Sequence, residues 1–197
     1  MQLTYKTISE QSYSEFKDRG SKFLGYAFPV YSVEDVKACL QALKKEHPKA
    51  GHHCYAYRVG TDGLHFRAND DGEPSGSAGR PILGQIDSAG LSNVLVVVIR
   101  YFGGTLLGVP GLIHAYKTTA AECLASANTL EKNIEFMVTL SYDYSVMNEV
   151  MQVLKQANAT LYNQEMQLFC LLKAGIPLIH KDPALEKLKE IRGLEIK

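Results

Sequence analysis

The run Val94–Ile99 constrains the fold of this chain more than any other segment. All of its side chains are apolar, and most of them are β-branched. A strand with apolar side chains at every position is one that is buried on both faces. The segment 112–127, which follows this run, has the composition of a long helix. The sequence therefore predicts a fully covered strand that leads into a helix.

Shorter elements precede this strand. Ser32 and Asp35 have the spacing of a helix capping box, and apolar residues recur after them at helical spacing. The segment 22–30 is rich in aromatic and small apolar residues, which favour a strand. The runs 54–59 and 64–68 are separated by Gly-Thr-Asp-Gly. That turn chemistry predicts a hairpin.

The pattern restarts after the long helix. Alternating residues predict a strand over 134–142, and Asp143 is placed to cap a helix that follows it. The run 161–172 predicts one or two strands, and Asp182 and Pro183 open a last helix. Only a strand stub fits at the end of the chain. This order, β-α-β-(β)-α, suggests a ferredoxin-like split βαβ unit.

We therefore predict an α+β fold of two domains, residues 1–130 and 131–197. With 46% hydrophobic and 21% charged residues, the chain has enough apolar material for a packed core. No apolar run is long enough to cross a bilayer, and the N-terminus has no signal-peptide pattern. We expect a cytoplasmic protein with no membrane partner. Its four widely spaced cysteines are expected to be reduced and buried.

Charge gives no global indication of a partner. The formal net charge is zero, with 13 basic and 12 acidic residues before residue 131 and 8 and 9 from there on. Any nucleic-acid site must therefore be local. The sequence does not determine the oligomeric state.

The segment 69–81, NDDGEPSGSAGRP, is the first candidate site. It is so rich in polar residues, glycine and proline that we expect it to lie outside the core. Its glycines permit consecutive backbone N–H groups to converge on an anion, with serine hydroxyls and Arg80 assisting. The alternative is an ordinary solvated loop whose glycines only turn corners. The length and chemical density of the segment favour function.

A second glycine cluster begins where the covered strand ends. Residues 100–105 read RYFGGT, and residues 108–111 come just before the helix that carries His114 and Lys117. Strand ends and helix N-termini are common ligand sites. Two adjacent aromatic side chains beside Arg100 are suited to stack on a nucleic-acid base, although we expect at least one of them to be a packing residue.

Sharper motifs are absent from the sequence. No Gly-Lys pair occurs, so there is no phosphate-binding P-loop, and Ser77 lacks one flanking glycine of a hydrolase elbow. His52, Cys54 and His65 form the best metal candidate, on the two strands of the expected hairpin. A fourth ligand is missing, so we predict no metal and no cofactor. His52 and His53 remain candidates for a base or a polar contact.

These residues allow a family to be named. Residues 51–59 (GHHCYAYRV), 70–81 (DDGEPSGSAGRP), 97–104 (VVIRYFGG) and 106–116 (LLGVPGLIHAY) closely resemble the YigZ/IMPACT family. The resemblance implies an N-terminal domain like ribosomal protein S5 domain 2. It also implies a C-terminal ferredoxin-like domain similar to the last domain of elongation factor G.

The resemblance also implies a role in translation. The eukaryotic relatives restrain the amino-acid-starvation kinase by competing for its ribosome-associated activator. This chain is expected to lack the additional N-terminal RWD-type domain that makes the kinase-pathway contact, so that mechanism does not transfer. Both domain types resemble pieces of the translation machinery, which is an analogy of fold.

The leading hypothesis is a non-enzymatic translation regulator that binds RNA, the ribosome or a translation factor through the glycine-rich surface. One alternative is an enzyme for a small phosphorylated or peptide-like substrate, with a histidine as base and an aspartate orienting it. The other is a pure protein-docking module. The candidate ligand- or anion-binding residues are Asp70, Asp71, Gly72, Glu73, Ser75, Gly76, Ser77, Gly79, Arg80, Arg100, Tyr101, Phe102, Gly103, Gly104, His114 and Lys117.

Overall fold

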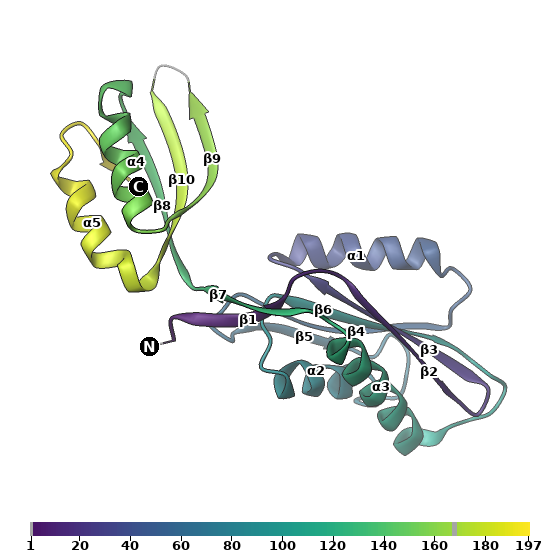
Figure 1. The fold of residues 1–197 in the computed structure, drawn as a ribbon. Coiled ribbons are helices and arrows are strands. Elements are labelled where there is room, and N and C mark those ends of the chain that lie inside the picture. Colours follow the sequence, from purple (N-terminus) through teal and green to yellow (C-terminus); the bar gives the residue numbers. More distant parts are fainter. Residues whose placement is uncertain (1, 167–168) are drawn as a thin grey trace. The chain divides into compact units, whose positions relative to one another are not determined.

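The structure is a computed structural model that describes residues 2–166 and 169–197 (Figure 1). The chain divides into two compact units, an N-terminal unit of Tyr5–Lys132 and a C-terminal unit of Asn133–Lys197. Residues 2–4 group with the C-terminal unit, whereas the sequence assigned them to the first domain. Residues 167 and 168, which belong to the run predicted to form one or two strands, lie outside the described residues.

The N-terminal unit is built on a five-stranded sheet in the order β2-β3-β6-β4-β5, and all of its neighbouring strands are antiparallel. The predicted hairpin is formed by the last two strands of that order. The strands are β2 (Ser12–Asp18), β3 (Ser21–Pro29), β4 (His52–Val59), β5 (His65–Asn69) and β6 (Val94–Tyr101).

Helices cover both faces of this sheet. α1 (Val33–Glu46) lies on one face, and α2 (Gly79–Ser88) and α3 (Gly108–Ala125) lie on the other (Figure 1). The predicted capping box at the start of α1 is confirmed, because Ser32 Oγ accepts from Asp35 N–H at 3.1 Å and Asp35 accepts from Ser32 N–H at 3.0 Å.

The central strand β6 shows why its sequence is apolar at every position. Its side chains alternate between two cores, as the pleat of a strand requires. One set packs under α2 and α3, and the other packs under α1. The first set is Val94, Val96 and Val98, and the second is Leu95, Val97 and Ile99. The prediction of a strand covered on both faces is confirmed.

The C-terminal unit has a four-stranded sheet in the order β11-β8-β10-β9. Two helices pack against this sheet, and sheet and helices form one hydrophobic core. The β-α-β-β-α-β sequence in this order is the ferredoxin-like fold, which confirms the prediction. Its elements are β8 (Glu135–Tyr142), η1 (Tyr144–Val146), α4 (Met147–Gln156), β9 (Thr160–Met166), β10 (Cys170–Pro177), η2 (Leu178–His180), α5 (Lys181–Glu190) and β11 (Glu195–Ile196).

Three strands and one helix were not predicted. β2 (Ser12–Asp18) is an edge strand of the five-stranded sheet, and β1 (Thr4–Ile8) and β7 (Thr129–Asn133) pair as a separate two-stranded sheet. Helix α2 was missed because Gly79 and Pro81 open it and the segment before it has loop composition. Its core contacts come from Ile82 and Ile86, which are fully buried. The helix is therefore held by tertiary packing and not by propensity.

Three of the four cysteines are buried, as the sequence predicts. All four cysteines are free; Cys54, Cys123 and Cys170 are buried, and Cys39 is half-buried. Within the described ranges, no helix combines the length and the apolar character that crossing a bilayer requires.

Candidate functional site

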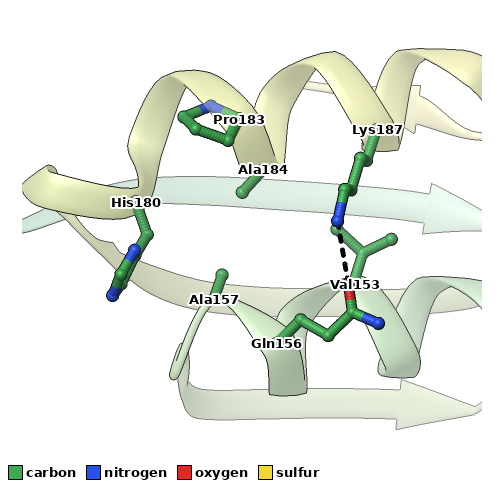
Figure 2. A pocket seen from close by; sticks show the side chains of 7 residues that line it. All are labelled: Val153, Gln156, Ala157, His180, Pro183, Ala184 and Lys187. Carbon is green, nitrogen blue, oxygen red and sulfur yellow. Dashed lines mark hydrogen bonds between the residues drawn. The ribbon is translucent and has the colours of Figure 1, made fainter.

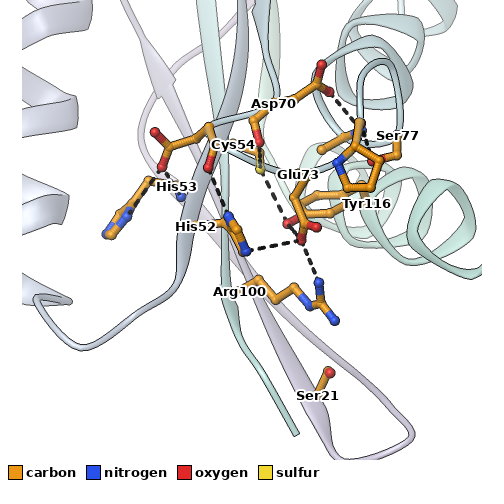
Figure 3. Close-up of polar contacts among 12 residues, drawn as sticks. Ser21, His52, His53, Cys54, Asp70, Glu73, Ser77, Arg100 and Tyr116 are labelled. Atoms are coloured by element: carbon orange, nitrogen blue, oxygen red, sulfur yellow. Dashed lines mark hydrogen bonds and ion pairs between the residues drawn. The ribbon is translucent and has the colours of Figure 1, made fainter. Parts of the chain in front are cut away.

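A buried ion pair lies at the centre of the glycine-rich region of the N-terminal unit (Figure 3). Arg100 Nη1 donates to Glu73 Oε1 at 2.7 Å, and the Tyr116 hydroxyl donates to the same oxygen at 2.8 Å. The side chains of Glu73 and Arg100 are only 4% and 7% exposed. These bonds join three segments that are distant in the sequence: the glycine-rich segment, the end of β6 and helix α3.

The position of Arg100 follows from the pleat of β6. It continues the row of Val94, Val96 and Val98, so its side chain faces α3 rather than solvent. Its neighbours across the sheet are Phe23 in β3 and His52 in β4. A charged residue at the end of an apolar row requires a partner, which Glu73 supplies.

The expected anion-binding backbone exists, but its anion is part of the protein. The Asp70 carboxylate accepts from the N–H groups of Gly76, Ala78 and Gly79 at 2.9, 3.0 and 2.8 Å. Burial opposes ionisation of Asp70, but these bonds together with the charge of Arg80 lower its pKa overall. The carboxylate therefore stabilises the start of α2 in the place of an external ligand.

The expectation that residues 69–81 lie outside the core is wrong for part of the segment. Glu73 is 8% exposed, and Ser77 and Ala78 are fully buried. Ser77 Oγ donates to the Pro74 carbonyl at 2.6 Å, so this hydroxyl is used within the segment. Polar residues are buried here because each has an internal partner.

The remaining glycines and serine of this segment lie nearer to solvent. Gly72 and Ser75 are exposed, and Gly76 is half-buried. Gly72 and Gly76 have φ values of +89° and +76°, which side chains with a β-carbon rarely adopt. These glycines are thus required by the turns that bring Glu73 inward.

The thiol and phenol beside the ion pair are held in their protonated forms. Cys54 Sγ donates to the Asp70 carbonyl at 3.0 Å and lies 3.3 Å from the Tyr116 hydroxyl oxygen. Burial raises the pKa of the Cys54 thiol well above its usual range. Burial, reinforced by Cys54 and Glu73, likewise raises the pKa of Tyr116. Neither group is suited to act as a nucleophile near neutral pH.

His52 and His53 face opposite sides of the sheet. His52 Nδ1 lies 2.9 Å from the Asp71 carbonyl oxygen, so it must carry the proton, and Nε2 lies 3.9 Å from Glu73 Oε1. His53 faces α1, and its backbone N–H donates to the Asp71 carboxylate at 2.7 Å. Burial lowers the pKa of His53, which favours its neutral form. Only His52 belongs to the Glu73 cluster.

The second glycine cluster is more exposed. Phe102 is 57% exposed, and its ring lies 5.6 Å from the Arg100 guanidinium carbon. Tyr101 is the packing aromatic that we expected, because its hydroxyl bonds to His47 at 2.9 Å on the α1 side. Gly103 and Gly104 are exposed. A β-carbon on Gly103 would overlap the backbone of the β2–β3 turn, so only glycine fits there.

The remaining predicted cations lie on the two helices of this face. Arg80 in α2 and Lys117 in α3 are exposed. His114 is also exposed, and its ring meets the edge of Phe16 at 6.0 Å. These side chains are therefore accessible to a ligand, whereas Arg100 is enclosed.

The metal candidate is not assembled. His65 pairs with Val59, seven residues along β4 from His52, so about 23 Å of strand separates them. His65 lies on the partner strand β5, as expected, but the register places it at the far end of the hairpin from His52 and Cys54. In the described part of the chain, no group of three or more histidine, cysteine or acidic side chains could hold a metal ion.

The C-terminal unit has a separate hollow between α4 and α5 (Figure 2). Its longest polar side chains bond to each other, Lys187 Nζ to Gln156 Oε1 at 2.9 Å. None of its residues was a candidate from the sequence. The lining residues are Val153, Gln156, Ala157, His180, Pro183, Ala184 and Lys187. The lining therefore has three polar side chains, two of which already bond to each other.

Sequence reasoning missed the roles of Tyr116, Cys54 and Ser21. Ser21 is fully buried at the start of β3, and its hydroxyl accepts from Gly103 N–H at 3.2 Å. No local signal marks Ser21 or Cys54, because their partners come from other strands and loops. The burial of Arg100 was predictable, because it lies on the same face of β6 as Val94, Val96 and Val98.

Comparisons with known proteins agree with this architecture. The Impact N-terminal domain matches residues 19–124. The chain is 35% identical to the IMPACT family member YigZ of Escherichia coli K12, over 80% of this chain and 78% of that protein. It is 37% identical to the Protein IMPACT homolog of Saccharomyces cerevisiae, over 56% of this chain and 43% of that protein.

A solved structure supports the fold over the full length. A crystal structure described as that of a hypothetical protein superposes with a TM-score of 0.79 at 29% identity, and covers 100% of this chain and 97% of that one. The domain match and the share of this chain that aligns with YigZ together establish the family. The chain belongs to the IMPACT family.

Proposed function

We propose that this chain is a translation-associated regulator that acts in the cytoplasm by binding an RNA component of the translation machinery. The family resemblance supports the connection with translation. The surroundings of Glu73 support binding rather than catalysis, because its carboxylate is held by Arg100 and Tyr116 and burial keeps the Cys54 thiol and the Tyr116 phenol protonated.

The observation that carries the proposal is the Arg100–Glu73–Tyr116 network. It fixes together the segment 69–81, the end of β6 and helix α3, and each of these carries or is followed by an exposed side chain suited to bind RNA. Phe102 offers an aromatic face, and Arg80 and Lys117 offer cations. Aromatic faces that stack on bases and cations that contact phosphates are the two components of single-stranded RNA sites.

Anisotropy titrations of a labelled single-stranded RNA over a range of salt concentrations test this proposal. Replacing both Arg80 and Lys117 with alanine should weaken binding and reduce the salt slope by about 1.4, since each lost phosphate contact removes about 0.7. The matched control is Lys37→Ala with Lys45→Ala on α1, which lies on the other face of the sheet. An equal effect of both pairs, or no RNA binding by the native chain, would contradict the proposal.

A second candidate function is docking of a translation-related protein. Leu106, Val109 and Ile113 are exposed by 82%, 46% and 38%, which is unusual for apolar side chains so close in the sequence. Sedimentation with ribosomes that survives nuclease treatment and fails in Leu106→Ser would favour this candidate over RNA.

A further inference from the structure

The Arg100 guanidinium is incompletely used by the protein. Its Nη1 is occupied by Glu73, but its Nε–H is buried and has no hydrogen-bond acceptor among the described residues. The whole residue is only 5% exposed. A buried donor without a partner destabilises a fold, so its retention calls for an explanation.

The geometry of arginine defines which edge of the Arg100 guanidinium takes no part in the bond to Glu73. Nε–H lies on the same side of the guanidinium as Nη2, and together they form the side-on edge that binds an oxyanion with two parallel bonds. Since Glu73 takes Nη1, this edge is not required for the ion pair. Figure 3 shows the guanidinium between Glu73 on one side and Ser21 on the other.

Two aromatic rings lie near the Arg100 guanidinium, and they differ in exposure. Phe23, which is fully buried, and Phe102, which is 57% exposed, each place their ring 5.6 Å from the guanidinium carbon. Phe23 is fixed in the core. Phe102 is the ring on the solvent side, and exposed Gly103 and Gly104 follow it in the chain.

We propose that the side-on edge of Arg100 is a binding subsite for a single phosphate group, which enters when Phe102 moves aside. The phosphate accepts from Nε–H and Nη2, and the displaced ring stacks on the base that the phosphate carries. The subsite rests on the proposed function, because it adds one buried, directional phosphate contact to the surface contacts of Arg80 and Lys117.

Nitrogen-15 NMR of the native chain tests the subsite directly. The Arg100 Nε–H signal, assigned by its loss in Arg100→Lys, should shift and saturate on titration with inorganic phosphate. A short RNA should saturate it at about tenfold lower concentration, because a base adds stacking on Phe102. Adenosine without phosphate should leave the signal in place. Saturation by inorganic phosphate but with no gain for RNA would assign the subsite to small phosphorylated molecules.

Two outcomes separate this inference from the proposed function. If RNA shifts the backbone signals of Arg80 and Lys117 while the Arg100 Nε–H signal stays fixed, the subsite is wrong and RNA binding stands. If RNA shifts none of these signals, the proposed function fails. Phe102→Ala removes the movable ring and leaves the Arg100–Glu73 ion pair in place, so inorganic phosphate should still shift the Arg100 Nε–H signal in that variant. If the shift is lost there, the proposal that phosphate enters when Phe102 moves aside is wrong.

Discussion

The two segments 69–81 and 102–111 are both rich in glycine, but their surroundings differ. The first is held by internal bonds, because Asp70 accepts from three backbone N–H groups and Glu73 accepts from Arg100 and Tyr116. The second presents Phe102 and Leu106 to solvent. Glycine content therefore indicates where the backbone must turn, and not whether its polar groups are free for a ligand.

Removing the centre of the first segment should have the largest effect on stability. Glu73→Ala leaves Arg100 buried without its partner, which should cost about 3–5 kcal/mol of unfolding free energy. Urea denaturation followed by circular dichroism measures this cost. Glu73→Gln keeps an acceptor for Tyr116 and should cost less. A loss below about 1 kcal/mol for the alanine variant would show that the ion pair is not structural.

The contact between the second segment and the β2–β3 turn should come next. Gly103→Ala places a β-carbon into the backbone of Gly20 and Ser21, which should cost about 1–3 kcal/mol. Gly84→Ala is the matched control, because a β-carbon there meets open space within helix α2. That control should stabilise by up to about 1 kcal/mol. Equal melting temperatures for the two variants would contradict the close contact.

Acid should remove the stabilisation that the Asp70 carboxylate gives to the first segment. The folded-state pKa of Asp70 is lowered, so its ionised form stabilises the fold above its unfolded pKa, and this contribution is lost as the pH falls through the folded value. Asp70→Asn should cost about 1–2 kcal/mol at pH 7, as for a lost helix cap. The difference from the native chain should shrink below about pH 4. A difference independent of pH would exclude this role.

The smallest effect is expected at the exposed aromatic. Phe102→Ala should change stability by less than about 1 kcal/mol, because most of the ring is already in water. Phe23→Ala removes a fully buried ring at the same distance from Arg100 and should cost about 3–5 kcal/mol. Similar losses in thermal unfolding would show that the second segment is as fixed as the first.

Much of the fold was accessible from local pattern. The apolar run of β6, the capping box at Ser32 and the restart of periodicity in the second half predicted the covered strand, α1 and the ferredoxin-like unit. Helix α2 was not accessible in this way, because its first turn contains Gly79 and Pro81 and its stability comes from the burial of Ile82.

The sequence alone determined most of the buried strands and helices, such as β6 and α1, since those depend on the spacing of apolar side chains along a few turns or strand positions. It also placed the chemically dense region between β5 and α3. Only the tertiary structure decided how that region is used. Arg100 and Glu73 are separated by 27 residues and Tyr116 and Glu73 by 43, and hydrogen bonds between such distant groups leave no local trace in the chain.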